Sequence, residues 1–361
     1  MKILYDYQSF HYIRYGGISR YTYELIKHAV NCQELDVHLF AGLFWTAREI
    51  ELFKHDCADF TGFRRSASLT PFKILGIINR LLFAKYRHQK TFDIYHPTLY
   101  LDLYPEFKGK RILTVHDLIG IYYPENIDLS ISAKLIAKTS PRSSKILAVS
   151  EYTKLDLINI LKIPEEKIKV THIANPLTIE VKDERIIKED YILHVGGEGV
   201  HKNFHALLTA YSNSNYLRNN FKLVKFGVSR LNKIEEEIVG KNKIKDRVVL
   251  LSGSDIVLAN LYKYASAFVF PSLYEGFGIP PLEAMHYGCP VVVSNRSSMP
   301  EIVGEAGLYF DPENQEEIIE KCETLLNDSD LRVKLITKGY LQEKKFSWEK
   351  CFNETLSAYL D

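Results

Sequence analysis

The sequence has few of the features that mark disulfide-linked, zinc-bound or membrane-spanning proteins. Its 361 residues include only five cysteines, and no two of them share the C-x-x-C spacing typical of zinc or redox sites. No apolar run reaches the roughly 18 residues of a bilayer-crossing helix. The opening MKILYDYQSF has a short apolar run that Asp6 interrupts, which predicts a first strand rather than a signal peptide. We therefore expect a cytoplasmic protein with reduced thiols.

An excess of charge of either sign is also missing. The chain has 46 basic and 45 acidic residues, for a formal net charge of +1. Such a balance gives no general attraction for polyanions, so nucleic acid is not an expected partner. A hydrophobic content of 46% and a charged content of 25% are typical of a soluble globular protein.

Short segments rich in Ile, Val and Phe alternate with helical patterns, which indicates parallel sheets built from strand-helix-strand units. The length favours two domains, and the polar segment 175–190 separates two sets of predicted strands. We predict two doubly wound α/β domains facing a cleft, with ligands at the carboxyl ends of the strands. The predicted strands are 2–6, 36–40, 93–97, 111–117, 145–150 and 168–173, then 191–197, 221–227, 247–253, 267–271, 290–294 and 308–311.

The stretch FVFPSLYEGFGIPPLEAMHYGCPVVVS places two glutamates, Glu275 and Glu283, eight positions apart. Glu275 follows a predicted strand, whereas the Pro-Pro pair begins a helix and puts Glu283 in its first turn. Gly276 and Gly278 let a ligand approach backbone N–H groups at a helix N-terminus, which suits a phosphate or a sugar. The alternative is that Glu283 only caps the helix and Glu275 is solvated.

This stretch and its continuation to FDP resemble the donor-site signature of the family 4 retaining glycosyltransferases. Further matching motifs occur in the order of that family, namely YGGISRYTYEL (15–25), TVHDL (114–118), AVSEYTKLDL (148–157), VGGEGVHKNF (195–204) and FSWEK (346–350). The resemblance implies the GT-B fold of two Rossmann-like domains. It assigns 1–180 to an acceptor-binding domain, 185–342 to a nucleotide-sugar domain, and 343–361 to a helix that packs back on the N-terminal domain.

The resemblance also implies roles for residues of the donor site. Glu283 would hold the nucleotide ribose, and Glu275 would lie beside the donor sugar. The backbone of Gly276, Phe277, Gly278 and Ile279 would contact the hexose hydroxyls and the phosphate. Lys202 would bind the diphosphate, where the leaving group gains negative charge and needs a fixed cation.

In the N-terminal half, the resemblance assigns His116 to the donor sugar and the Gly16-Gly17 turn to close approach of the diphosphate. An ordinary tight turn and a structural histidine at a strand end are the alternatives. Asp117 either orients the imidazole of His116 or caps the following loop.

One position departs from the family pattern. Family members carry an arginine a few residues before the lysine, and this chain has Gly197 and Glu198 there. We expect Glu198 to turn outward, and Arg230 or His201 to supply the missing positive charge.

The implied reaction is transfer of a hexose, with mannose or a related sugar favoured, from a nucleotide sugar to a hydroxyl of a glycan acceptor. GDP-sugars are favoured over UDP-sugars, and no separate cofactor or metal is expected. The only Asp-x-Asp, Asp328 to Asp330, lies between two predicted helices, where capping explains it. A non-catalytic nucleotide-sugar-binding subunit and a sugar-nucleotide epimerase of the same fold remain as alternatives.

The segment 61–92 contains no acidic residue and seven basic ones. A basic amphipathic helix of this kind can lie on an anionic membrane, where a lipid-linked intermediate of O-antigen, capsule or exopolysaccharide would be found. The alternative is a helix that covers the N-terminal sheet with its charges solvated. The apolar stripe consists of Ile74, Ile77, Ile78, Leu81 and Leu82, and the basic residues are Arg64, Arg65, Lys73, Arg80, Lys85, Arg87 and Lys90.

Overall fold

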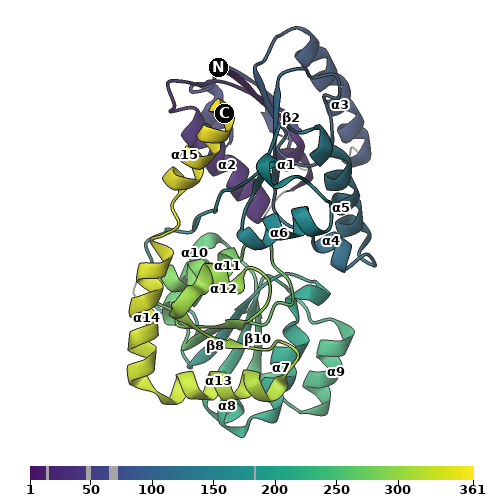
Figure 1. Cartoon of the computed structure of the whole chain (residues 1–361). Helices are drawn as coiled ribbons and strands as arrows, with labels where there is room; N and C mark the ends of the chain where they lie inside the picture. The colour runs from purple at the N-terminus through teal and green to yellow at the C-terminus, as the bar shows by residue number, and fades with distance from the viewer. Residues whose placement is uncertain (14–15, 46–49, 65–71, 183) are drawn as a thin grey trace. The chain divides into compact units, whose positions relative to one another are not determined.

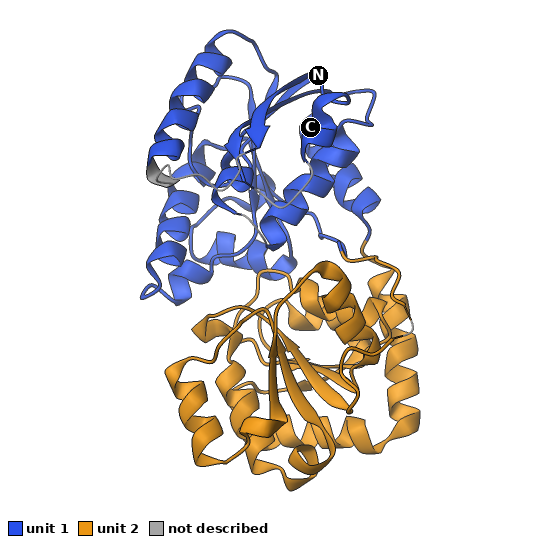
Figure 2. Ribbon diagram, turned by 180° about the vertical axis from the view of Figure 1, so that it is seen from behind, with its two compact units in different colours: residues 1–176, 347–361 blue, residues 177–346 orange. Residues whose placement is uncertain are grey.

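The computed structural model describes residues 1–13, 16–45, 50–64, 72–182 and 184–361. The chain divides into two compact units (Figure 2). Unit 1 consists of Met1–Pro176 together with Ser347–Asp361, and unit 2 is Leu177–Phe346. Each unit is a parallel sheet covered by helices, so the predicted pair of α/β domains is confirmed.

The sheet of unit 1 has seven strands in the order β3-β2-β1-β4-β5-β6-β7, and all its pairs are parallel. The order reverses direction between β1 and β4, which is the switch point of a doubly wound sheet. Six strands match the predicted segments, whereas β3 was missed. The strands are β1 (Lys2–Tyr5), β2 (Asp36–Phe44), β3 (Asp59–Arg64), β4 (Ile94–His96), β5 (Lys110–Val115), β6 (Lys145–Ala148) and β7 (Ile168–Val170).

Helices cover both faces of this sheet, with α2 and α15 on one side and α3 and α5 on the other (Figure 1). The C-terminal helix α15 packs on α2 within unit 1, so the predicted return of the chain to the N-terminal domain is confirmed. The helices are α1 (Gln8–Tyr12), α2 (Gly17–Ala29), α3 (Phe72–His88), α4 (Ile119–Tyr122), α5 (Ile127–Thr139), α6 (Glu151–Asn159) and α15 (Trp348–Leu360), with single turns η1 (Ile50–Lys54), η2 (Ser140–Arg142) and η3 (Glu165–Lys167).

Helix α3 covers the sheet with a different face from the apolar stripe seen in the sequence. Its buried residues include Asn79 and Phe83, and the ring of Phe83 lies 5.3 Å from that of Phe40 on β2. The stripe points to solvent instead, with Ile77 61% and Leu81 67% exposed. The helix therefore has apolar side chains on both its inner and its outer face.

Unit 2 has a six-stranded parallel sheet in the order β10-β9-β8-β11-β12-β13, and its switch point lies between β8 and β11. All six strands match predicted segments. They are β8 (Tyr191–Val195), β9 (Lys222–Phe226), β10 (Val248–Leu251), β11 (Ala267–Phe270), β12 (Val291–Ser294) and β13 (Gly307–Phe310).

The helices of unit 2 pack on both faces of its sheet. At the start of α14, the side chain of Asp328 accepts a hydrogen bond from the N–H of Leu331. The capping explanation of the Asp-x-Asp is thus confirmed. The helices are α7 (Phe204–Asn213), α8 (Asn215–Asn220), α9 (Lys233–Lys241), α10 (Asp255–Tyr264), α11 (Ile279–His286), α12 (Met299–Val303), α13 (Gln315–Asn327) and α14 (Ser329–Glu343), with turns η4 (Val200–Lys202), η5 (Lys245–Arg247) and η6 (Gly304–Ala306).

All five cysteines carry free thiols. Within the described ranges, no helix combines the length and apolar character that a bilayer crossing requires.

Candidate functional site

The loops that leave β8 and β11 meet at the switch point of unit 2. The N–H of Leu273, after β11, donates a 2.8 Å hydrogen bond to the carbonyl of His201 in η4, after β8. This bond fixes the two loops against each other at the carboxyl edge of the sheet. In doubly wound sheets, that edge is where ligands bind.

Lys202 and Glu275 form an ion pair across these loops. The Lys202 Nζ lies 2.7 Å from Glu275 Oε1, and the side chains are 23% and 13% exposed. The same Nζ lies 5.7 Å from the centre of the Phe270 ring at the end of β11. The structure therefore brings Lys202 and Glu275 into direct contact. The sequence predicted that both take part in catalysis.

The loop that begins at Glu275 is held by two serines that the sequence reasoning did not single out. The N–H of Glu275 donates to Ser297 Oγ at 2.9 Å. The hydroxyl of Ser298 lies 3.0 Å from the Glu275 carbonyl and 2.7 Å from that of Phe277. The ring of Phe277 packs edge-on against Phe346 at 5.7 Å. The sequence does not indicate that these two serines hold the loop, because only the fold brings them close to it.

Gly278 is required by the geometry at the start of α11. Its φ of +101° is the left-handed conformation that side chains disfavour, and an added Cβ would lie 2.3 Å from Met299 Cε. The helix begins directly after it, at Ile279, one residue before the Pro-Pro pair. Glu283 consequently lies in the second turn of α11, and the prediction that it lies in the first turn was wrong.

Glu283 lies within α11, whose N-cap position is Gly278. Its side chain lies inside unit 2, where the residue is 4% exposed, and Glu283 Oε2 accepts a 2.9 Å hydrogen bond from the hydroxyl of Tyr262 on α10. The ring of Tyr262 stacks on Tyr287 with an interplanar angle of 4°. Tyr287 in turn bonds the backbone of Ile179 through its hydroxyl. A buried carboxylate is thus oriented by a tyrosine that no motif marks.

The position of the missing arginine lies in the loop after β8. Glu198 and Gly197 are exposed, so the expected outward turn of Glu198 agrees with the structure. Burial, together with the neighbouring Lys202, lowers the pKa of His201 to about 4. A neutral His201 supplies no charge near pH 7, which leaves the exposed Arg230 as the remaining candidate for that role.

Buried side chains on and around β8 and β9 support these loops. His194 on β8 is fully buried, and burial lowers its pKa to about 3. Lys225 on β9 makes an ion pair of 2.8 Å with Glu235, and its Nζ lies 4.2 Å from the centre of the Phe204 ring. This layer fixes the ends of β8 and β9, from which the Gly196-Gly197 and Gly227 turns depart.

In unit 1, His116 follows β5 directly. Its backbone N–H donates a 3.3 Å hydrogen bond to the hydroxyl of Tyr100. Its imidazole ring packs edge-on against the ring of Tyr21, with 4.9 Å between the ring centres. Burial lowers the pKa of His116 to about 4. Asp117 Oδ1 accepts the N–H of Ile119, so this carboxylate caps the following turn.

The Gly16-Gly17 pair begins α2, with Gly16 at the N-cap and a φ of +142°. Beneath this region, a buried hydrogen-bond chain connects α15 to β5. His96 bonds the Tyr359 hydroxyl through Nδ1 at 2.6 Å and Thr114 Oγ1 through Nε2 at 2.9 Å. Tyr21 bonds the same Thr114 Oγ1 at 3.0 Å, next to His116.

Comparisons with known proteins agree with this architecture. The family model described as Glycosyltransferase Family 4 matches residues 15–174, and that described as Glycosyl transferases group 1 matches residues 178–342. An O-antigen chain mannosyltransferase B of Escherichia coli is 29% identical, over 95% of each chain. An uncharacterised glycosyltransferase of Methanocaldococcus jannaschii is 32% identical, over 69% of this chain and 68% of the relative.

Among solved structures, HepE of Anabaena in complex with UDP-glucose superposes with a TM-score of 0.74 at 18% identity, covering 99% of this chain and 100% of that chain. At this identity the likeness establishes the fold alone. Together with the two family models and the relatives, it establishes the GT-B architecture that the motifs implied. The chain is a hexosyltransferase and belongs to the family 4 glycosyltransferases.

Proposed function

We propose that the chain transfers mannose from GDP-mannose to a hydroxyl of a lipid-linked glycan in the assembly of a surface polysaccharide. The observation that carries this proposal is the match to an O-antigen chain mannosyltransferase over 95% of both chains. The choice of mannose comes from the name of that relative, and the preference for GDP comes from the family resemblance, because no side chain of the described site encodes either of them.

The proposed roles in unit 2 are those that the family resemblance implies, and the contacts at the switch point support them. Lys202 binds the diphosphate, the loop from Gly276 to Ile279 offers backbone groups to the sugar and phosphate, and Glu283 accepts hydrogen bonds from the ribose hydroxyls. Glu275 lies beside the donor sugar. Burial of Glu283 and its hydrogen bond to Tyr262 support a fixed acceptor of hydrogen bonds.

In the proposed reaction, the bond from the anomeric carbon to the phosphate oxygen breaks and a bond to the acceptor oxygen forms on the same face of the sugar. Because both bonds lie on the same face, the configuration is retained. The acceptor proton passes to the leaving phosphate, so no separate base is needed, and the proposed reaction uses no metal. From unit 1, His116 contacts the donor sugar as a neutral imidazole, which its lowered pKa supports.

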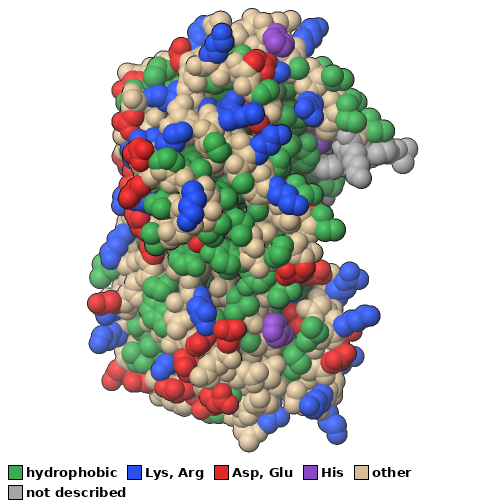
Figure 3. Space-filling model, turned by 45° about the vertical axis from the view of Figure 1, so that its right-hand side comes forward, with side chains coloured by type: hydrophobic (Ala, Val, Ile, Leu, Met, Phe, Trp, Pro, Cys, Tyr) green, Lys and Arg blue, Asp and Glu red, His purple; other side chains and the backbone are tan. Residues whose placement is uncertain are grey.

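The acceptor is proposed to reach the enzyme from a membrane surface. The outer stripe of α3 leaves large apolar side chains exposed beside basic ones, and Figure 3 shows hydrophobic and basic side chains interspersed on one face of the molecule. Cosedimentation with anionic vesicles tests this contact. Leu81→Asp is expected to weaken it, and unchanged binding would reject it.

Calorimetric titration with GDP, UDP and ADP, followed by a transfer assay with GDP-mannose, tests the central proposal. In the titrations, we expect GDP to bind most tightly and Glu283→Ala to weaken that binding. In the transfer assay, we expect an α-linked product from an α-linked donor. Tighter binding of UDP would contradict the nucleotide assignment, and an inverted product would contradict retention.

The absence of the family's arginine favours one alternative, a subunit that binds nucleotide sugar without transferring it. Gly197 and Glu198 occupy the relevant loop. That alternative predicts tight GDP-mannose binding with neither transfer nor slow hydrolysis, whereas a transferase without acceptor hydrolyses the donor slowly.

A further inference from the structure

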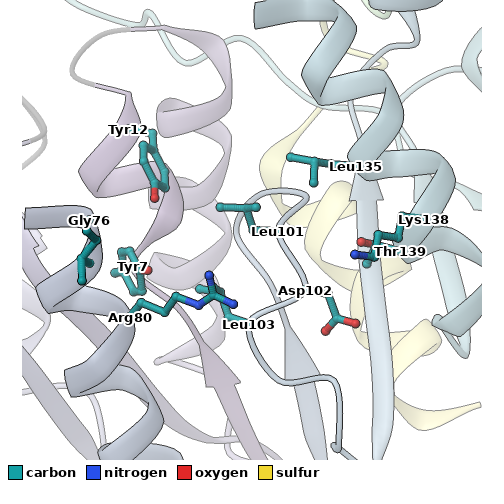
Figure 4. A pocket seen from close by; sticks show the side chains of 11 residues that line it. Tyr7, Tyr12, Gly76, Arg80, Leu101, Asp102, Leu103, Leu135, Lys138 and Thr139 are labelled. Carbon is teal, nitrogen blue, oxygen red and sulfur yellow. The ribbon is translucent and has the colours of Figure 1, made fainter. Parts of the chain in front are cut away.

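Unit 1 contains a groove of about 660 Å³ that none of the proposed donor-site residues line. Its walls come from α3 and α5, and its floor from the chain that follows β1 and β4 (Figure 4). Tyr7 and Arg80 lie on one side, Leu135 and Lys138 lie on the other, and Leu101 lies between them.

The groove occupies the ligand position of its own sheet. Tyr7 comes two residues after β1, and Leu101 follows β4, the strand that pairs with β1 where the strand order reverses. Unit 2 has its ion pair of Lys202 and Glu275 at the equivalent switch point. Side chains at such a position converge from several elements, so the groove is placed where doubly wound folds bind ligands.

Apolar and aromatic side chains form most of the lining. Ile77 and Leu135 face the groove from the two helices, and Leu101 and Leu103 come from the loop after β4. Gly76 also lines the α3 wall, near the hydroxyl of Tyr12. The outer stripe of α3 continues from Ile77 to the exposed Leu81. This surface suits a hydrocarbon chain that extends beyond the groove.

The charge of the groove is positive. Arg80 and Lys138 approach from opposite walls, and both are exposed. The one carboxylate of the lining, Asp102, is 7% exposed at its side chain and paired with Arg111 at 3.2 Å and Arg142 at 3.0 Å. Its charge is compensated by those arginines, so an anion in the groove would meet the two uncompensated cations.

We propose that this groove binds the diphosphate and the first isoprenoid units of a lipid-linked acceptor, with the diphosphate between Arg80 and Lys138. The inference rests on the proposed function, which supplies a lipid-linked glycan as acceptor. A ligand with an anionic head and an apolar chain matches both the two cations and the apolar walls, whereas a free nucleotide matches only the cations.

Calorimetric titration of the full chain with farnesyl diphosphate, below its micelle concentration, tests the groove. We expect saturable binding, and at least tenfold weaker binding of pyrophosphate alone and of farnesol alone. Arg80→Ala and Lys138→Ala are each expected to weaken farnesyl diphosphate binding about tenfold. Lys85→Ala on α3 and Lys134→Ala on α5 are matched exposed cations outside the lining, and both should bind as the native chain does.

GDP titration of every variant controls for folding and separates the two proposals. Farnesyl diphosphate binding that depends on Lys202 but not on Arg80 or Lys138 would place the probe in the donor site and overturn the inference. Pyrophosphate binding as tight as the prenyl probe, or no saturable binding of the probe, would overturn it too. If GDP fails to bind while farnesyl diphosphate binding still depends on Arg80 and Lys138, the groove assignment is supported and the donor-site assignment is wrong.

Discussion

Tyr262→Phe separates the role of Glu283 in stability from its role in binding. The substitution removes one hydroxyl from a fully buried ring and deprives a carboxylate that is 4% exposed of a 2.9 Å hydrogen bond. Hydrogen bonds to charged groups contribute about 1.5 to 3 kcal/mol, and burial of both partners keeps water from replacing the donor. At about 2 to 4 °C for each kcal/mol, the unfolding midpoint should fall by several degrees.

The same change should weaken GDP binding about tenfold, because a carboxylate that loses its orienting bond no longer presents a fixed acceptor to the ribose. Differential scanning fluorimetry and calorimetry measure the two effects on one sample. Tyr287→Phe is the control, since this hydroxyl bonds the Ile179 backbone and not Glu283. Tyr287→Phe should lower the stability of the protein and leave its GDP affinity unchanged. Reduced stability with unchanged GDP affinity in Tyr262→Phe would refute ribose binding by Glu283.

Four further predictions follow from the contacts described above. Lys202→Ala and Glu275→Ala should each reduce transfer by at least a hundredfold, because Lys202 is proposed to bind the diphosphate and Glu275 to lie beside the donor sugar; near-native transfer by either variant would contradict these roles. Gly278→Ala should destabilise the protein by about 1 to 3 kcal/mol through its positive φ, as measured by denaturant unfolding, and an unchanged midpoint would show that the loop relaxes. Turnover should be unchanged in excess EDTA, whereas complete loss would require a metal. Stability should be full above pH 6.5 and decline as pH falls towards 3, by about 1.4 kcal/mol per pH unit for each of His96 and His194, because burial lowers their folded pKa values to about 3 while the unfolded imidazoles still take up protons; a flat midpoint between pH 7 and 5 would contradict this.

The fold was accessible from the sequence because its strands are buried on both faces. Segments such as 267–270 and 291–293 are continuous apolar runs, which is the pattern of a parallel sheet covered by helices. Strand β3 was missed because DFTGFR has little apolar content and lies at the edge of its sheet, where one side needs no partner strand. The missed strand explains why the first set was counted as six rather than seven.

The candidate site was only partly accessible. Lys202 and Glu275 were identified through motifs, and the structure brings their side chains into contact. Ser298 and Tyr262 were not identified, because both act through tertiary contacts with residues 21 positions away in the sequence. The stripe on α3 was recognised correctly as apolar, but its orientation depended on whether Phe83 or Leu81 faces the sheet. Periodicity alone does not decide between two apolar faces of one helix.

The ion pair of Lys202 and Glu275 has a consequence for the order of events in the proposed reaction. Glu275 holds the Lys202 ammonium at 2.7 Å, and both side chains retain some exposure. A diphosphate carries more negative charge than a single carboxylate, so it competes with Glu275 for the Lys202 ammonium. The contact that binds the leaving group would then free the carboxylate to accept hydrogen bonds from the sugar. Donor binding would in this way assemble both proposed contacts in a single step, and a free nucleotide without its sugar would leave Glu275 with no partner to replace the lysine.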